Sequence, residues 1–227
     1  MPSRYVIAQL RTAGGAHRQT VIDSLTRVSQ YSAAQEAGVL KFCVAIPRPG
    51  TSDDKTSVFA IEEYADQAGF DAHMASQAVA DLTKVFSADP TIWSGAPEIY
   101  GLEQKLEPRI QFVKSKTGQV EDPYIVFATL GFAQGKTGKG VQKFKEMVVT
   151  VEKEEEGTLA YTVLEDEAGK CVRTVEVYEG KQSVESVEEK HGKLGGGDKA
   201  EGRTKKDEIW KLQMVAGYLW KEEKPRL

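Results

Sequence analysis

The chain has 227 residues, with 30 Lys and Arg against 34 Asp and Glu, and a net charge of −4. Hydrophobic residues make up 40% of it, which is enough for a packed core and excludes a disordered chain. No apolar run approaches the ~20 residues of a membrane-spanning helix, and no signal-peptide core follows the first residues, so we expect a cytoplasmic protein without membrane contact. The two cysteines, Cys43 and Cys171, each stand in an apolar strand-like run and neither belongs to a Cys-x-x-Cys pair, which disfavours a disulfide framework and a thiolate metal site.

An internal repeat organises the chain. Residues 5–8 match residues 124–127, and residues 38–42 match residues 157–161, in both cases at a shift of 119 positions. Two separate matches at one shift are hard to obtain by chance. Each copy predicts a strand, a helix, two strands, a helix and a final strand.

In the first copy, apolar or alternating runs indicate the strands, and apolar residues at the i, i+4, i+7 spacing indicate the helices. The expected elements are a strand at 5–12, a helix at 20–31, strands at 39–46 and 56–64, a helix from Asp66 with the buried stripe Phe70, Met74, Ala78, Leu82 and Val85, and a strand near 97–104. Gly38 closes the first of these helices, as glycine commonly does.

The second copy repeats this plan. Its expected elements are a strand at 124–132, a helix with Val141, Phe144, Met147 and Val151, strands at 158–165 and 170–178, a helix with Val184, Val187, His191 and Leu194, and a strand at 209–220. We therefore divide the chain into a first repeat at 1–106, a linker at 107–122 that lies along the sheet, and a second, degenerate repeat at 123–227. Within the second repeat, the Gly- and Lys-rich tract 195–208 has no apolar period and is expected to be a mobile loop.

The βαββαβ order predicts a ferredoxin-like unit, an α+β fold in which two helices cover one face of an antiparallel sheet. The other face of such a sheet needs a cover. Two copies in one chain can supply it to each other, so we expect the two ferredoxin-like repeats to pack sheet to sheet as an intramolecular barrel. Its interior must hold either side chains or a ligand.

A short motif in the first repeat resembles the signature of antibiotic biosynthesis monooxygenase (ABM) domains, which belong to the dimeric α+β barrel superfamily. The pair Glu62-x-Tyr64 ends the expected third strand, and His73 follows nine residues after the tyrosine. The second repeat keeps the pair as Glu176-x-Tyr178 but has Val187 nine residues later, and His191 follows one helical turn after that valine. The resemblance covers residues 5 to about 104 well and residues 124–222 less closely.

This resemblance implies a cofactor-independent monooxygenase with no metal, in which a deprotonated small aromatic, quinol or polyketide-type substrate passes an electron to O2. The protein then supplies a base, polar groups that stabilise the oxyanion, and a dry pocket. His73 is the implied catalytic residue, because an imidazole titrates near neutral pH. The implied substrate-binding residues are Gln9, Phe42, Tyr64, Phe70, Met74, Trp93 and Tyr100. The expected partners are the substrate and O2, with a homodimer allowed.

Several alternatives stay open. The chain contains no asparagine and has no histidine near Thr83, which disfavours the haem-degrading branch of the superfamily. The same pocket would also suit a non-oxidative cyclase, isomerase or dehydratase, or a non-catalytic small-molecule-binding protein. His73 lies beside an apolar stripe and can equally be structural, and Tyr64 and Tyr178 can simply seal a helix against the sheet. Nucleic-acid binding is disfavoured because residues 1–108 carry 9 basic and 13 acidic side chains.

Overall fold

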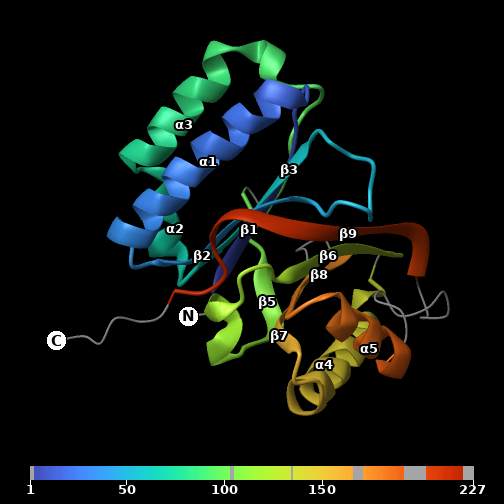
Figure 1. The fold of residues 1–227 in the computed structure, drawn as a ribbon. Helices are drawn as coiled ribbons and strands as arrows, with labels where there is room; N and C mark the ends of the chain where they lie inside the picture. Colours follow the sequence, from blue (N-terminus) through green and yellow to red (C-terminus); the bar gives the residue numbers. More distant parts are fainter. Residues whose placement is uncertain (1–2, 103–104, 134, 166–170, 192–202, 222–227) are drawn as a thin grey trace. The chain divides into compact units, whose positions relative to one another are not determined.

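The computed structural model describes residues 3–102, 105–133, 135–165, 171–191 and 203–221 (Figure 1). The chain divides into two compact units. Unit 1 comprises Met1–Pro47, Asp53–Glu103 and Met214–Leu227, and unit 2 comprises Arg48–Ser52 and Gln104–Gln213. The last residues of the second repeat therefore belong to the unit that the first repeat builds.

Unit 1 is a ferredoxin-like α+β unit. Its elements are β1 (Arg4–Arg11), α1 (Gly15–Gln35), β2 (Val39–Pro47), β3 (Ser57–Tyr64), α2 (Gln67–Met74), α3 (Gln77–Ala88), the 3-10 helix η1 (Pro90–Ile92) and β4 (Glu98–Tyr100). The strands lie in the order β4-β1-β3-β2, with antiparallel neighbours, and the end of β9 follows β2. The buried core lies where α1 and α2 cover one face of this sheet.

Unit 2 repeats the plan. Its elements are β5 (Glu107–Val113), the 3-10 helix η2 (Ser115–Gln119), β6 (Tyr124–Phe132), α4 (Thr137–Glu154), β7 (Thr158–Glu165), β8 (Cys171–Tyr178), α5 (Lys181–His191) and β9 (Arg203–Tyr218). The strand order β9-β6-β8-β7-β5 contains the same ferredoxin-like sheet with one added strand at the edge. The predicted α+β fold with two ferredoxin-like repeats is thus confirmed, while their sheet-to-sheet packing stays a prediction.

The second helix of the first repeat differs from its prediction. It is two helices, because α2 ends at Met74 and the Ser76 hydroxyl accepts a hydrogen bond from the Val79 N–H (3.3 Å) as the N-cap of α3. This break takes Met74 out of the predicted stripe, and its side chain is 43% exposed. Ala78, Leu82 and Val85 of the same stripe remain half-buried on α3.

Two segments predicted as a linker and a loop form strands. Residues 107–113 of the linker are β5, which pairs with β7 at the edge of the unit 2 sheet. The final strand begins at Arg203, earlier than expected, so residues 203–208 of the predicted loop belong to β9. The rest of that loop, residues 195–202, and Leu194 lie outside the described residues.

The two faces of the unit 1 sheet carry different chemistry. Val6, Ala8 and Leu10 of β1 join the core under the helices, so the alternating Tyr5 and Gln9 lie on the opposite face. There the Tyr5 hydroxyl donates to Glu63 Oε2 (2.6 Å), and the Lys41 ammonium donates to the Tyr5 oxygen (3.0 Å) and pairs with Glu63 (3.2 Å). Burial opposes the charge of Lys41, but Tyr5 and Glu63 outweigh it and raise the pKa of that lysine. Each buried charge here has a partner, as burial requires.

Gly38 and Gly69 let the first turn of α2 lie close to the start of β2. A Cβ on Gly38 would lie 2.8 Å from the Cα of Gly69, and a Cβ on Gly69 would lie 2.9 Å from the Gly38 carbonyl oxygen. Both obstacles are backbone atoms, which cannot rotate away. The start of β2 and the first turn of α2 therefore approach each other only because both residues lack a side chain.

We expect Gly38→Ala to lower the free energy of unfolding by about 1–3 kcal/mol, because the added methyl group must push α2 away from β2. Urea unfolding measures this change. Gly180→Ala is the matched control, since a Cβ at that position meets no atom within 4 Å. Equal effects of the two alanines would contradict the close contact.

Candidate active site

The candidate site surrounds His73 in the last turn of α2. Asp66 caps this helix by accepting a hydrogen bond from the Gly69 N–H (2.9 Å), and α2 turns Phe70 and His73 toward the sheet. The imidazole is 3% exposed. It lies between two aromatic rings, with its centroid 5.4 Å from that of Tyr64 and 5.8 Å from that of Phe42. The Tyr64 and Phe70 rings also pack edge to face. Four of the predicted site residues therefore lie together: Phe42, Tyr64, Phe70 and His73.

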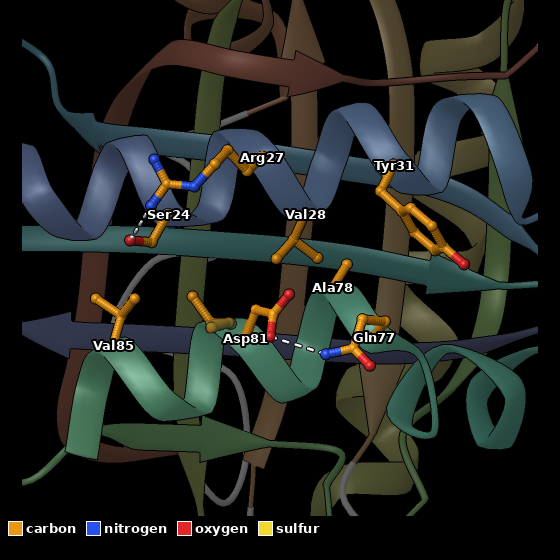
Figure 2. A pocket seen from close by; sticks show the side chains of 9 residues that line it. Ser24, Arg27, Val28, Tyr31, Gln77, Ala78, Asp81 and Val85 are labelled. Atoms are coloured by element: carbon orange, nitrogen blue, oxygen red, sulfur yellow. Dashed lines mark hydrogen bonds between the residues drawn. The ribbon is translucent and has the colours of Figure 1, made fainter. Parts of the chain in front are cut away.

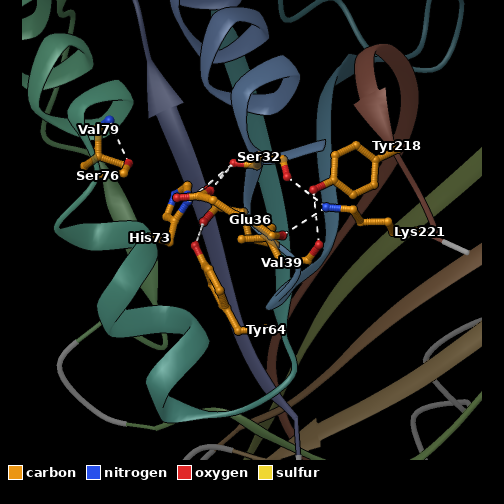
Figure 3. A network of polar contacts seen from close by, with 10 residues as sticks. Ser32, Glu36, Val39, Tyr64, His73, Ser76, Val79, Tyr218 and Lys221 are labelled. Atoms are coloured by element: carbon orange, nitrogen blue, oxygen red, sulfur yellow. Dashed lines mark hydrogen bonds and ion pairs between the residues drawn. The ribbon is translucent and has the colours of Figure 1, made fainter. Parts of the chain in front are cut away.

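The C-terminal end of α1 supplies the polar partners of this ring (Figure 3). Glu36 Oε2 lies 2.7 Å from His73 Nδ1, and the Ser32 hydroxyl donates to the same carboxylate oxygen (2.6 Å). Ser32 is buried one helical turn before Glu36, which explains why both side chains point to one place. A carboxylate that accepts from Nδ1–H leaves the Nε2 lone pair free. The contact therefore selects the tautomer that can act as a base.

A second carboxylate lies beside this pair. The Tyr64 hydroxyl donates a hydrogen bond to Glu62 Oε2 across the two-residue spacing of the motif. Burial raises the pKa of Glu62, and Glu36 adds to this effect, although His73 and Tyr64 oppose it. Burial and the charge of Glu62 also raise the pKa of Tyr64. One imidazole thus faces two carboxylates, of which Glu62 holds its proton more strongly than an exposed glutamate.

A groove of about 310 Å³ runs between α1 and α3 (Figure 2). Its apolar lining includes Val28 of α1 and Ala78, Leu82 and Val85 of α3, with Arg27 and Asp81 among its polar residues. Ser24 and Val28 of this groove belong to the same every-fourth-residue row of α1 as Ser32 and Glu36. The row therefore leads from the groove to the His73 pair. None of the twelve residues of α3 is fully buried, although Ala78, Val79, Leu82 and Phe86 pack against the core of unit 1.

The other predicted site residues lie elsewhere. Gln9 is on the opposite face of the sheet, where its amide is 3.4 Å from the Ser57 hydroxyl. Tyr100 is in register with Ile7 on that same face, and its hydroxyl donates to Glu98 (2.8 Å). The alternation of strand side chains, which sequence spacing alone did not assign to a face, separates both residues from His73.

Trp93 and Met74 are also away from the imidazole. Trp93 forms an isolated β-bridge with Thr12, the residue that follows β1. Tyr64 pairs with Arg4 at the opposite end of that strand. The Trp93 ring packs edge-on against Phe86, with ring centroids 4.8 Å apart. Met74 is exposed because α2 ends there. These two residues do not line the His73 site as predicted.

Sequence reasoning missed Ser32 and Glu36, the two residues in contact with Nδ1. The internal repeat held a signal for one of them. Glu36 matches Glu155 at the same shift of 119, and each residue is the C-cap of the first helix in its repeat. Ser32 has no such signal, because Val151 stands at the matching position.

The second repeat keeps the carboxylates without this imidazole. The Tyr178 hydroxyl donates to Glu176 Oε2 (2.6 Å), as Tyr64 does to Glu62. Glu155 accepts from the Ser186 hydroxyl (3.3 Å) and pairs with Lys190 (3.0 Å). Val187 occupies the position that matches His73, and the side chain of His191 lies outside the described residues.

Within the residues that the structure describes, no three His, Cys, Asp or Glu side chains come together as a metal site. In the same residues, every helix is too short or too polar to cross a membrane.

Comparison with known protein families finds a match within the first repeat. Residues 3–84 match the family model described as antibiotic biosynthesis monooxygenase. No curated protein sequence matches the chain significantly.

Solved structures match nearly the whole chain. A candidate monooxygenase from Fusobacterium nucleatum aligns with a TM-score of 0.78 at 20% identity, covering 97% of this chain and 98% of its own. A second candidate monooxygenase, from Lactobacillus acidophilus, aligns with a TM-score of 0.74 at 14% identity, covering 97% of this chain and 99% of its own. An anthrone oxidase-like protein aligns with a TM-score of 0.62 at 12% identity, covering 95% of this chain and 92% of its own. At these identities the likeness establishes the fold.

The resemblance seen in the Glu62-x-Tyr64 motif is therefore confirmed by the match to residues 3–84. The first repeat is an antibiotic biosynthesis monooxygenase domain, in a chain built as a tandem of two ferredoxin-like α+β repeats.

Proposed function

We propose that this protein is a cofactor-independent monooxygenase that oxidises a small aromatic, quinol or polyketide-type molecule at the His73 site of the first repeat. The observation that carries the proposal is the buried contact of 2.7 Å between Glu36 and His73 Nδ1 in the repeat that matches the family. Such a pair holds an imidazole in the orientation and tautomer of a general base.

The proposed reaction needs only a base and an acidic substrate. His73 Nε2 removes a proton from an activated CH2 or phenol, and the resulting anion transfers one electron to O2. Superoxide and the substrate radical then join in a carbon–oxygen bond, giving a peroxide. Loss of the second proton from that carbon breaks the O–O bond and leaves a carbonyl. Substrate CH2 and O2 become C=O and H2O, so the substrate supplies all four electrons and the imidazolium returns its proton to the departing hydroxide.

The groove between α1 and α3 is the proposed path for the substrate. Its volume of about 310 Å³ is at the small end of ligand pockets, which suits a molecule of a few fused rings. Apolar residues would contact the rings, and the Ser24 to Glu36 row of α1 would guide them toward the imidazole. Because His73 is 3% exposed, the packing around it must open locally before a substrate contacts Nε2.

The second repeat is proposed to support the first rather than to react. Val187 replaces the imidazole there, and Glu155 is neutralised by Lys190 instead. Glu176 is buried and accepts hydrogen bonds from Thr174 (2.7 Å) and Tyr178 (2.6 Å). Burial raises its pKa despite these hydrogen bonds, and its oxygens are occupied by neighbouring hydroxyl groups.

We expect His73→Ala to lower kcat/KM for O2 consumption by about 10²- to 10⁴-fold, the usual contribution of a general base. An oxygen electrode with a panel of anthrones and quinols measures this loss. Val187→Ala in the second repeat is the matched control, because it truncates the equivalent position and should change kcat/KM by less than about twofold.

The product separates the proposal from its alternatives. Under ¹⁸O2 the oxygenase places one labelled atom in the product, whereas a cyclase, isomerase or dehydratase on the same site places none. Tight binding without turnover would point to a small-molecule-binding protein. Equal activity in wild type and His73→Ala would remove the imidazole from the chemistry.

Glu176 generates a pH prediction with a definite sign. A raised pKa means that the folded protein keeps this proton to a higher pH than the unfolded chain does. Stability is therefore lost as the pH rises from the pKa of the unfolded chain to that of the folded protein. Glu176→Gln imitates the neutral acid and escapes the loss. We expect its free energy of unfolding, relative to wild type, to rise as the pH increases above about 4, the ordinary pKa of a glutamate.

Urea unfolding at intervals of pH measures that difference. Glu189→Gln is the control, since this exposed glutamate lies on the neighbouring helix α5. If both variants show the same pH dependence relative to wild type, Glu176 ionises like a surface group and the expectation is wrong.

A further inference from the structure

Lys221 ties the end of the chain to the end of α1. After β9 ends at Tyr218, the Lys221 backbone N–H donates to the Leu40 carbonyl (3.0 Å). Its side-chain ammonium donates to the carbonyls of Ser32 (2.9 Å) and Glu36 (3.0 Å), as Figure 3 shows. Each carbonyl also accepts a backbone N–H, Ser32 from Glu36 (3.1 Å) and Glu36 from Val39 (3.1 Å). The ammonium is therefore a second donor to both, and its charge opposes the negative end of the helix dipole.

These two carbonyls belong to the residues whose side chains contact His73 Nδ1. Ser32 and Glu36 lie 3.4 Å and 2.7 Å from that nitrogen. Glu36 is the C-cap of α1: its N–H still donates to the Ser32 carbonyl, while its own backbone angles leave the helical range, so Lys221 adds a tie at the point where the helix ends. Holding the two carbonyls therefore holds the two side chains.

The second unit contains a similar cap, in which the second acceptor is the Glu156 carbonyl (3.4 Å) instead of the carbonyl that matches Ser32. Lys114 follows β5, its N–H donates to the Leu159 carbonyl (2.8 Å), and its ammonium donates to the Glu155 carbonyl (2.8 Å). Leu159 and Glu155 each lie 119 positions after their counterparts Leu40 and Glu36. The capping chemistry is thus duplicated, while the imidazole beside it is present in unit 1 and replaced by Val187 in unit 2.

We propose that Lys221 is a positioning residue for His73, acting through Glu36. By holding the Ser32 and Glu36 carbonyls at the end of α1, it keeps the Glu36 carboxylate on Nδ1–H and so keeps the Nε2 lone pair available. The catalytic consequence rests on the function proposed above, whereas the structural link from Lys221 to the imidazole does not. Lys114 performs the same capping with no such consequence.

The duplication supplies a matched pair of variants. Lys221→Met and Lys114→Met each remove one ammonium and keep most of the aliphatic stem. Tyr218 gives the C-terminal segment a second tie, because its hydroxyl donates to the Val39 carbonyl (3.3 Å). We therefore expect both variants to fold with comparable losses in melting temperature.

The decisive readout is the tautomer of His73, observed in long-range ¹H–¹⁵N spectra of the full chain and assigned with His73→Ala. We expect one tautomer, protonated at Nδ1, in wild type and Lys114→Met, and a mixture of tautomers in Lys221→Met. Lys221→Arg, which keeps donors and charge, should restore the single tautomer. In the oxygen assay, Lys221→Met should lower kcat by about tenfold with KM within about twofold.

An unchanged His73 tautomer in Lys221→Met would overturn the proposal, and so would equal tautomer mixtures in Lys221→Met and Lys114→Met. If Lys221→Met does not fold, Lys221→Gln, which keeps neutral donors, is read against the same two outcomes. An inactive wild-type protein would refute the proposed function alone, because the spectra need no substrate.

Discussion

The contact between Glu36 and His73 is the interaction on which the proposed chemistry depends. It joins the last turn of α1 to the last turn of α2, and the rings of Phe42 and Tyr64 enclose it. Helix ends are the places where a helix frays first, so a site built from two of them needs support from outside. At the end of α2, the Ser76 N–H donates to the His73 carbonyl (3.0 Å), and at the end of α1 the Lys221 ammonium donates to the Glu36 carbonyl (3.0 Å).

Comparison of the two repeats distinguishes features that serve the fold from the residue proposed to carry the chemistry. Both repeats keep a tyrosine that donates to a glutamate two residues earlier, a glutamate at the end of the first helix, and a lysine on that helix end. These shared features need no substrate to explain them, because they close a helix and seal it against a sheet. What unit 1 adds is an imidazole beside the carboxylate, where unit 2 has Val187. In the proposed function, the reactive residue is therefore a single imidazole on a structural frame that exists twice.

Most elements were predictable from the sequence, because the hydrophobic period and the shift of 119 are local or repeated signals. The departures have physical causes. The helix that starts at Asp66 is interrupted because Ser76 caps a new helix, and this changes which face Met74 presents. The tract at 203–208 looks like a loop by composition, yet it pairs with β6, since a partner strand can order residues that have no apolar period.

For the site, the sequence by itself determined the motif: Glu62, Tyr64 and His73 at family spacing, with Phe70 on the same helix. Only the tertiary structure showed that Glu36 and Ser32 complete it, because they come from a helix about forty residues earlier. It also placed Gln9 and Tyr100 on the opposite face of the sheet, a choice that depends on strand register. The sequence could name the residue types that the chemistry needs, whereas their meeting at one nitrogen depends on packing between segments distant in the chain.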